Sequence, residues 1–221
     1  MHCNETSAAA TQHCGTECFK VFSSDLAHAP SLRVLDLSGN HLCMHSCANL
    51  AALALPHLSM LQNLNLGNND LGNSGMHAVI ASLHRANVLT SLDTLEATSC
   101  GLTDMRAHAC NWLHEFLPHA CSLRKLNLSG NEGIADGGVG ALARHLPQLR
   151  ALQELDVAGT GVSPAGEGRL REVQDALGGK LAVLKVLVSL LCNAGVFLIH
   201  LEACTRAQPR EAAGLLVCCT L

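Results

Sequence analysis

The chain has very few aromatic residues, which make up 2% of its 221 residues: one Trp, four Phe and no Tyr. Hydrophobic residues nevertheless account for 48% of the sequence. A core must therefore be built from Leu, Val and Ala. Short strands stacked in a repeat require this composition, because identical aliphatic positions then pile up in columns.

Charged residues are also scarce, at 14%, and the formal net charge is only −4. A dedicated nucleic-acid binder would show a basic stripe, which this chain lacks. The charge is also too small to give a strong field for steering a basic partner. We therefore expect no nucleic-acid partner.

The first thirty residues contain no apolar run long enough for the hydrophobic region of a secretory signal. Without an export signal, the 12 cysteines are most simply free thiols in a reducing compartment. Several fall at core positions, where free Cys behaves as a small hydrophobe. These features predict a cytoplasmic protein.

Motifs of catalysis are missing as well. The sequence has no Gly-rich phosphate loop, no G-x-S-x-G elbow and no H-E-x-x-H. Asp36, Glu96 and Asp156 recur because they share one strand position, which indicates a surface property rather than an acid/base pair. We therefore predict no enzymatic activity, no catalytic residue, no cofactor and no small-molecule substrate.

What the sequence does contain is a repeat. The first two copies read Leu32-x-x-Leu35-x-Leu37-x-x-Asn40-x-Leu42 and Leu61-x-x-Leu64-x-Leu66-x-x-Asn69-x-Leu71. Degraded copies follow, and their second leucine positions complete the series Leu35, Leu64, Leu95, Leu126 and Leu155, with steps of 29, 31, 31 and 29 residues. This is the leucine-rich-repeat signature, with a period long enough for a helix in every unit.

Helical periodicity fills the stretches between the leucine segments. The predicted core-facing helix positions are Cys47, Leu50, Ala51 and Ala54; Met76, Val79, Ile80 and Leu83; Ala109, Trp112, Leu113 and Phe116; and Val139, Leu142, Ala143 and Leu146. Ser163 before Pro164 marks a helix start, and Gly178-Gly179 a helix stop. Strands pack about 4.8 Å apart and helices about 8–10 Å apart, so the stack must bend with its strands inside. The fold class is an α/β leucine-rich-repeat solenoid, a horseshoe with parallel strands on the concave face and helices on the convex face.

The two ends of the chain depart from the pattern. We expect a degenerate segment over residues 1–16, a repeat domain over 17–205 and a tail over 206–221. The domain would begin with the helix of an incomplete unit, carrying Phe19, Phe22 and Leu26, whose strand would lie near 6–10. It would end with a degenerate sixth unit from about residue 181, whose helix would carry Val196, Ile199 and Ala203.

The sixth unit has an alternative interpretation. Residues 181–201 are mostly apolar and have the length of a membrane span, which would make a membrane-tethered protein. Lys185, Asn193 and His200 oppose this reading, because polar and charged groups are costly within lipid. If the segment is a strand instead, its apolar edge needs a cover. We expect that cover from the segment after Ala203, from a second copy in an edge-mediated dimer, or from a continuation of the chain.

The units LQNLNLGNNDLGNSGMHAVIASL and LRKLNLSGNEGIADGGVGALARHLPQLRALQELDVAGTGVSPAG resemble the ribonuclease-inhibitor-like class of leucine-rich repeats, and the resemblance covers about residues 17–205. It implies a partner-binding horseshoe without chemistry of its own. One alternative within the class is a regulator similar to the activator of the nuclear-transport GTPase, although the acidic tail of that family is missing. The chain departs from the usual pattern in its 31-residue units and in Cys100 and Thr160, which stand at the asparagine position.

The repeat asparagines Asn40, Asn69 and Asn131 are predicted to be structural. An Asn amide can satisfy backbone groups of its own turn and of the next coil, which the bend out of the strand leaves unpaired. Cys100 and Thr160 can do so more weakly. We expect no direct part for these residues in binding.

One segment suggests a metal site, because His41, Cys43, His45 and Cys47 place four soft ligands within seven residues. Cys47, however, aligns with the core position of Met76 and should point inward. The turn would also have to fold back to close a tetrahedron. We therefore predict no metal site here.

The candidate binding surface is the concave sheet. Because side chains alternate along a strand, the residues on either side of each second leucine face the concavity. The predicted partner-binding residues are Val34, Asp36, Asn63, Asn65, Thr94, Glu96, Lys125, Asn127, Glu154 and Asp156. This polar and moderately acidic surface suits a protein partner that presents a few Lys or Arg, and a few central side chains should dominate the affinity.

Overall fold

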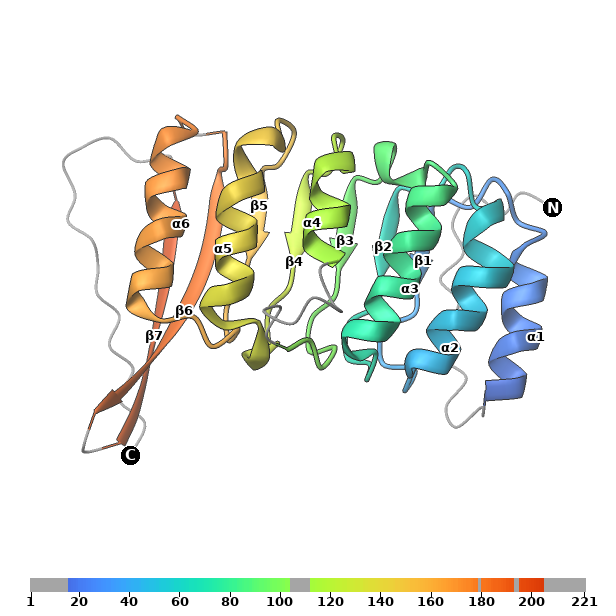
Figure 1. Ribbon diagram of the computed structural model, residues 1–221, viewed down its shortest axis with the longest axis horizontal. Helices are drawn as coiled ribbons and strands as arrows, with labels where there is room; N and C mark the ends of the chain where they lie inside the picture. Colours follow the sequence, from blue (N-terminus) through green and yellow to red (C-terminus); the bar gives the residue numbers. More distant parts are fainter. Residues whose placement is uncertain (1–15, 104–111, 179, 193–194, 205–221) are drawn as a thin grey trace.

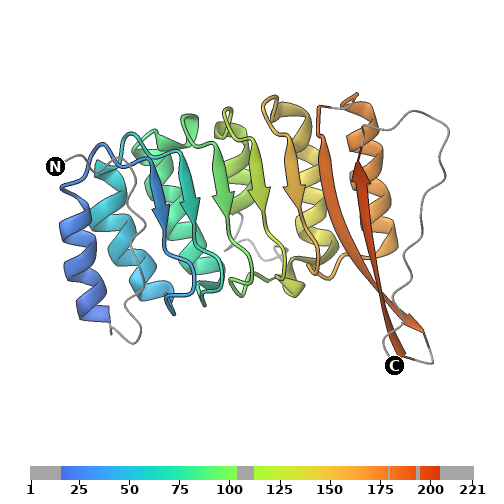
Figure 2. The ribbon, with the colours of Figure 1, turned by 180° about the vertical axis from the view of Figure 1, so that it is seen from behind.

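The computed structural model describes residues 16–103, 112–178, 180–192 and 195–204, and places one sheet against one layer of helices (Figures 1 and 2). The strands are β1 (Val34–Asp36), β2 (Asn63–Asn65), β3 (Thr94–Glu96), β4 (Lys125–Asn127), β5 (Glu154–Asp156), β6 (Val183–Cys192) and β7 (Gly195–Cys204). The α-helices are α1 (Thr16–Leu26), α2 (Met44–Asn49), α3 (Gly72–Arg85), α4 (Trp112–Phe116), α5 (Ala135–His145) and α6 (Pro164–Ala176). Single turns flank them: a π-helix η1 (Leu50–Ala54) and the 3₁₀ turns η2 (Leu55–His57), η3 (Val88–Thr90), η4 (Leu117–His119), η5 (Glu132–Ile134) and η6 (Leu146–Gln148).

Strands β1 to β6 pair in parallel in the order of the sequence. The register aligns the second leucine of every repeat, in the column Leu35, Leu64, Leu95, Leu126, Leu155 and Leu184. Each of these leucines is buried. The predicted period is thus confirmed at every step, including the step into the sixth strand.

The core lies between the sheet and the helices. Nearly all predicted helix positions that the structure describes are buried, and Ala143 is partly buried against the core. The chain's single tryptophan, Trp112, is the largest fully buried side chain and packs beside Phe116 in α4, with ring centroids 6.2 Å apart. Ala109 lies outside the described residues. The aliphatic core expected from the composition therefore contains an aromatic pair at α4, and a second pair, Phe19 and Phe22 of α1, lies at its N-terminal end with ring centroids 5.5 Å apart.

The asparagines Asn69 and Asn131 are buried and tie consecutive coils together. Asn131 Oδ1 accepts hydrogen bonds from the backbone N–H groups of Cys100 and Leu102, at 2.8 and 3.1 Å. Its Nδ2 donates to the carbonyls of Ala97 and Leu128, at 2.8 and 2.7 Å. The structural role is confirmed, but the bonds outside the residue's own turn reach the preceding coil, and not the next one as was expected.

Cys100 and Thr160 replace the asparagine with fewer bonds, as expected. Cys100 Sγ donates to the carbonyl of Leu66 at 3.2 Å, and Thr160 Oγ1 donates to the carbonyl of Val157 at 2.7 Å. Neither has the two nitrogen-bound hydrogens and the oxygen that an amide offers. These coils are therefore joined by fewer side-chain bonds.

Helix α6 begins where the sequence predicted. Ser163 is its N-cap, and the Ser163 hydroxyl accepts a hydrogen bond from the backbone N–H of Gly166 at 3.3 Å. Gly178, just beyond the helix, has a φ of +60°, the left-handed conformation that ends many helices. At the other end of the chain, α1 carries Phe19 and Phe22 against the core, which confirms the helix of an incomplete first unit. The strand proposed near residues 6–10 lies outside the described residues.

The helix predicted for the sixth unit is wrong. Residues 195–204 form strand β7, which pairs antiparallel with β6 over ten residue pairs and extends as a long hairpin (Figure 2). Val196, Phe197 and Ile199 favour strands, and antiparallel pairing satisfies a long row of backbone groups on the edge of β6. This edge of β6 is therefore paired with β7, which was not among the three covers predicted for it.

The alternative interpretation of residues 181–201 was a membrane-spanning helix. This segment contributes to β6 and β7. Across the described parts of the chain, no helix combines the length and the apolar character that crossing a bilayer requires.

Candidate binding surfaces

The sheet brings all ten predicted binding residues onto one face, in two adjacent columns. One column runs Val34, Asn63, Thr94, Lys125, Glu154 and Val183. The other runs Asp36, Asn65, Glu96, Asn127, Asp156 and Lys185. All are half-buried except Glu154, which is exposed, whereas the leucine between them in each strand is buried. The alternation therefore has the phase that the sequence predicted.

Four members of the second column also hold the turn that follows their strand. Asp36 Oδ1 accepts hydrogen bonds from the backbone N–H and the hydroxyl of Ser38, at 3.0 and 2.7 Å. In the same way, backbone N–H groups two residues further on donate at 3.0 Å to Asn65, Asn127 and Asp156. The Oδ1 atom of each of these side chains is thus used to hold its own turn, and only the other polar atom of the side chain is left to bind a partner.

Glu96 breaks this pattern because its longer side chain reaches sideways to the next strand. Lys125 Nζ lies 2.8 Å from Glu96 Oε1. This hydrogen bond raises the pKa of Lys125, and the negative charges of Glu96, Glu154 and Asp156 act in the same direction. Lys125 is therefore charged at neutral pH and lies among three carboxylates at the centre of the sheet.

A small depression of about 70 Å³ lies on the same face over β4, β5 and β6. The polar side chains that line it are Lys125, Asn127, Glu154, Asp156 and Lys185. Lys185 Nζ is 4.0 Å from Asp156 Oδ2, a looser pair than that of Lys125 and Glu96. The depression has room for the tip of one side chain rather than for a small-molecule substrate.

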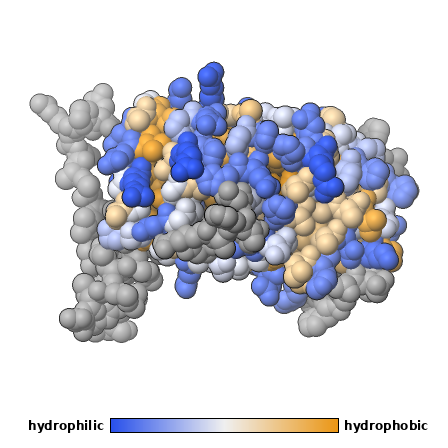
Figure 3. Space-filling model, viewed as in Figure 1, coloured by the Kyte–Doolittle hydropathy of each residue, from blue (hydrophilic) through white to orange (hydrophobic). Residues whose placement is uncertain are grey.

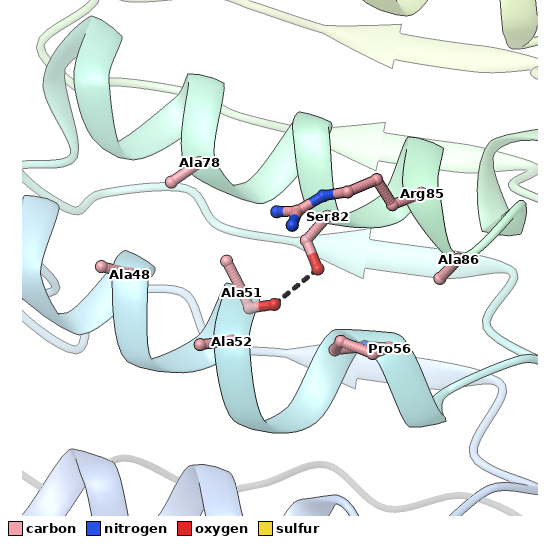
Figure 4. Close-up of a pocket in the computed structure, with 8 residues that line it drawn as sticks. All are labelled: Ala48, Ala51, Ala52, Pro56, Ala78, Ser82, Arg85 and Ala86. Carbon is pink, nitrogen blue, oxygen red and sulfur yellow. Dashed lines mark hydrogen bonds between the residues drawn. The ribbon is translucent and has the colours of Figure 1, made fainter.

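The convex face holds a larger hollow, of about 610 Å³, between α2 and α3. Small side chains on both facing elements leave this space, with Ala48, Ala51 and Ala52 on one side and Ala78 and Ala86 on the other (Figure 4). Figure 3 shows an apolar area over these two helices. Arg85 and Pro56 lie at one end of the groove, and the Ser82 hydroxyl donates to the carbonyl of Ala51 at 2.5 Å across it.

This groove was not among the surfaces predicted from the sequence. Its signal was present, because Ala48, Ala51, Ala52 and Ala78 put small residues on the facing sides of two neighbouring helices. Alanine nevertheless occurs on both buried and exposed faces of helices, so it does not by itself predict a groove. The depth of a groove depends on the distance between two helices.

The cysteine and histidine segment at the start of α2 places its thiols in two environments. Cys47 is fully buried, as predicted, and burial raises its pKa to about 12. Cys43 is half-buried, and the backbone N–H of Ser46 is the main cause that lowers its pKa to about 7. His45 Nδ1 lies 4.0 Å from Cys43 Sγ. Among the described residues, no group of three or more His, Cys, Asp or Glu side chains is placed to hold a metal ion.

The fold and the repeated turns define this molecule as a leucine-rich-repeat solenoid. One family model described as leucine-rich repeat matches residues 57–79 and 119–143, and a second matches residues 31–53. Each matched segment contains a strand of the sheet and at least the beginning of the helical segment that follows it. The matches therefore coincide with structural units.

Sequence similarity to known proteins indicates which type of leucine-rich repeat this chain contains. The chain is 38% identical over 109 residues to human NACHT, LRR and PYD domains-containing protein 13, a match that covers 48% of this chain and 10% of that protein. It is 32% identical over 136 residues to the ribonuclease inhibitor of Sus scrofa, covering 59% of this chain and 28% of that protein. The chain is a leucine-rich-repeat protein of the ribonuclease-inhibitor-like type, and it spans less than a third of the length of these relatives.

A solved structure shows the same fold at low identity. The C-terminal domain of tropomodulin from Caenorhabditis elegans superposes with a TM-score of 0.53 at 12% identity, covering 76% of this chain and 96% of that domain. This likeness concerns the fold alone. Repeats of this kind indicate a protein-interaction module, since stacked units create extended concave surfaces for binding.

Proposed function

We propose that this chain binds a partner protein through the concave face of its sheet, over β1 to β5, and that it does so without catalysing a reaction. The observation that supports this most directly is the register of the strands. It aligns nine polar side chains and Val34 in two columns on a face that the helices leave open (Figure 2).

The chemistry of this face fits a folded protein or peptide with basic side chains. Asp36, Glu96, Glu154 and Asp156 outnumber Lys125 and Lys185, so the surface carries a small net negative charge. Charge of this size selects orientation and partner more than it provides affinity. Uncharged Asn63, Asn65, Thr94 and Asn127 supply hydrogen bonds between the charged positions.

The convex groove between α2 and α3 is the competing surface. It is more apolar and larger than the depression on the sheet, but it is formed mainly by alanines, which give a partner little to recognise. The alternative of a GTPase-activating regulator has no specific support from the described residues. The following experiment separates the two surfaces, and a single-turnover GTP hydrolysis assay tests the GTPase-activating alternative.

The test compares two variants that each add one arginine, Thr94→Arg at the centre of the concave face and Ala78→Arg in the convex groove. Both positions are half-buried, and neither side chain caps a turn in the described structure. Quantitative affinity purification with mass spectrometry would identify partners of the unmodified chain. We expect Thr94→Arg to lose them and Ala78→Arg to keep them, with both variants folded by circular dichroism.

A second variant tests the charges without damaging the turns. Asp36→Asn and Asp156→Asn keep the Oδ1 atom that each turn requires, and Glu96→Gln keeps the length of the side chain. The combined variant should weaken capture of a basic partner and leave unfolding by urea nearly unchanged. Partners retained by the concave variants and lost by Ala78→Arg would transfer the site to the convex groove and refute the proposal.

A further inference from the structure

Two histidines from consecutive repeats meet on the helical side of the molecule. His114 of α4 and His145 of α5 are 31 residues apart, the same step that separates Leu95 from Leu126, so they occupy equivalent positions. His114 Nδ1 lies 2.8 Å from His145 Nε2, and the two rings are 5.0 Å apart at 73°. A hydrogen bond between two imidazoles therefore joins α4 to α5.

This bond restricts where a further proton can bind. His145 Nδ1 is buried and has no hydrogen-bond partner among the described residues. An unpaired lone pair on this atom costs less to bury than an unpaired N–H, which favours the neutral tautomer with the proton on Nε2, so His145 Nε2–H donates and His114 Nδ1 accepts. A proton on His114 Nδ1 would remove the acceptor. His145 could still accept a hydrogen bond from that proton if its own proton moved from Nε2 to Nδ1, but this would leave an unpaired N–H at the buried nitrogen.

The charges around the pair also oppose a proton. Burial is the main cause that lowers the pKa of His114, followed by His145 and by Arg144 of α5. The neighbouring acid of α4, Glu115, already pairs with His77 of α3, at 3.2 Å. The other charged or titratable groups of α5 and of the elements packed against α4 and α5 are Asp136 of α5, His84 and Arg85 of α3, His119 of η4, Glu132 of η5, and Glu167, Arg169, Arg171, Glu172 and Asp175 of α6. Glu167 and Arg171 pair with each other.

We propose that the His114–His145 hydrogen bond is an acid-sensitive latch, which holds α4 in the convex layer in its neutral form and releases α4 when the pair is protonated. The pair joins α5 to α4, which the structure describes over Trp112–Phe116. Trp112, Leu113 and Phe116 are buried in the core, so the place of α4 in the convex layer depends on its packing against the neighbouring elements.

The direction of the effect follows from linkage. The folded chain lowers the pKa of His114, so the unfolded state binds more protons below the ordinary histidine pKa of about 6.5. The contribution of the pair to stability is complete above that pH and is lost as the pH falls from there toward the lowered folded pKa. Because carboxylates titrate near pH 4, a window between about pH 6.5 and 5 isolates the histidines.

Trp112 provides the readout, because it is the only tryptophan in the chain, the chain has no tyrosine, and its side chain is fully buried in α4. We expect the emission of the unmodified protein to shift reversibly to longer wavelength as the pH falls through the window. The double variant His114→Gln/His145→Gln can form a hydrogen bond but cannot titrate, so its emission should stay constant there.

His57→Gln is the matched control. His57 is exposed at the end of η2, in an LPH turn equivalent to the LPQ turn of η6, so glutamine is already compatible with this position. The control should shift as the unmodified protein does. The same transition in the double variant, or a constant emission in the unmodified protein, would overturn the latch.

Histidine NMR keeps the proposal testable if the double variant does not fold. A titration of the unmodified protein, assigned with the single variants His114→Gln and His145→Gln, should give a pKa for His114 below about 6.5, and His145→Gln should raise it. A His114 pKa at or above the ordinary value would also overturn the proposal. None of these measurements needs the unidentified partner, so the outcome is independent of the concave binding site.

Discussion

Asn69 and Leu42 are 27 residues apart in the sequence, yet Asn69 Oδ1 accepts a hydrogen bond from the backbone N–H of Leu42 at 2.9 Å. The same oxygen accepts from the N–H of Asn40 at 3.0 Å, and Nδ2 donates to the carbonyls of Leu37 and Leu66 at 2.9 and 2.8 Å. One buried side chain thus completes the backbone hydrogen bonding of two coils.

Replacing Asn69 with Ala should therefore destabilise the protein strongly. Several buried backbone groups would lose their partners, and each unsatisfied group costs about 1–3 kcal/mol, so we expect a loss of at least about 3 kcal/mol. Urea unfolding followed by circular dichroism measures the change. Asn40→Ala is the matched control, because Asn40 has the same place in its repeat but is only half-buried, and it should lose about 1 kcal/mol or less. Equal losses in the two variants would contradict this account.

Alanine variants of Gly161 and Gly39 distinguish the cost of backbone strain from the cost of a steric clash. Both have positive φ, +69° and +66°, so an alanine at either position should cost about 1–2 kcal/mol for the left-handed conformation. A Cβ at Gly161 would also collide with the backbone carbonyl of Glu132, whereas one at Gly39 would meet nothing within 4 Å. Gly161→Ala should therefore lower the thermal midpoint clearly more than Gly39→Ala. A smaller loss at Gly161 would show that η5 moves aside easily.

The cysteines at α2 should react in a fixed order. The pKa of Cys43 is lowered to about 7, so its thiolate fraction, and its rate of alkylation by iodoacetamide, should rise with a midpoint near pH 7. Burial raises the pKa of Cys47 to about 12 and that of Cys100 to about 11, and both should react only after unfolding. Peptide mass spectrometry after timed labelling gives the order. Cys47 labelled in the folded protein as fast as Cys43 would disprove the packing of α2.

Lys125 should matter more for binding than for stability. Its side chain is 40% exposed and that of Glu96 is 27% exposed, so solvent screens the pair and Lys125→Gln should change the free energy of unfolding by less than about 1 kcal/mol. The substitution removes the central positive charge from among three carboxylates and should strengthen capture of a basic partner. Calorimetry of unfolding and titration with the captured partner would test the two parts separately. A loss of several kcal/mol would make Lys125 a structural residue.

The repeat predicted most of the local arrangement, because each unit places the same residue type in the same environment. The column from Leu35 to Leu184 and the burial of Cys47 followed from spacing, and the helix start at Ser163 followed from the serine and the proline after it. The two columns of the concave face followed too, since alternation along a strand fixes which side of the sheet a residue faces. Periodicity could not show that Asp36 and Asn127 use one oxygen to hold their own turns, because that depends on the path of the chain after the strand.

The sequence by itself determined the number of clear units, their register and the face on which Asn65 and Glu96 lie, because these features depend on local periodicity. Only the tertiary structure decided that residues 195–204 return as β7 instead of forming a helix. In this segment apolar residues fit both periods, and pairing with β6 made the difference. The contact of His114 with His145 and the groove beside Ala78 are likewise tertiary, because they depend on how closely one helix lies against the next.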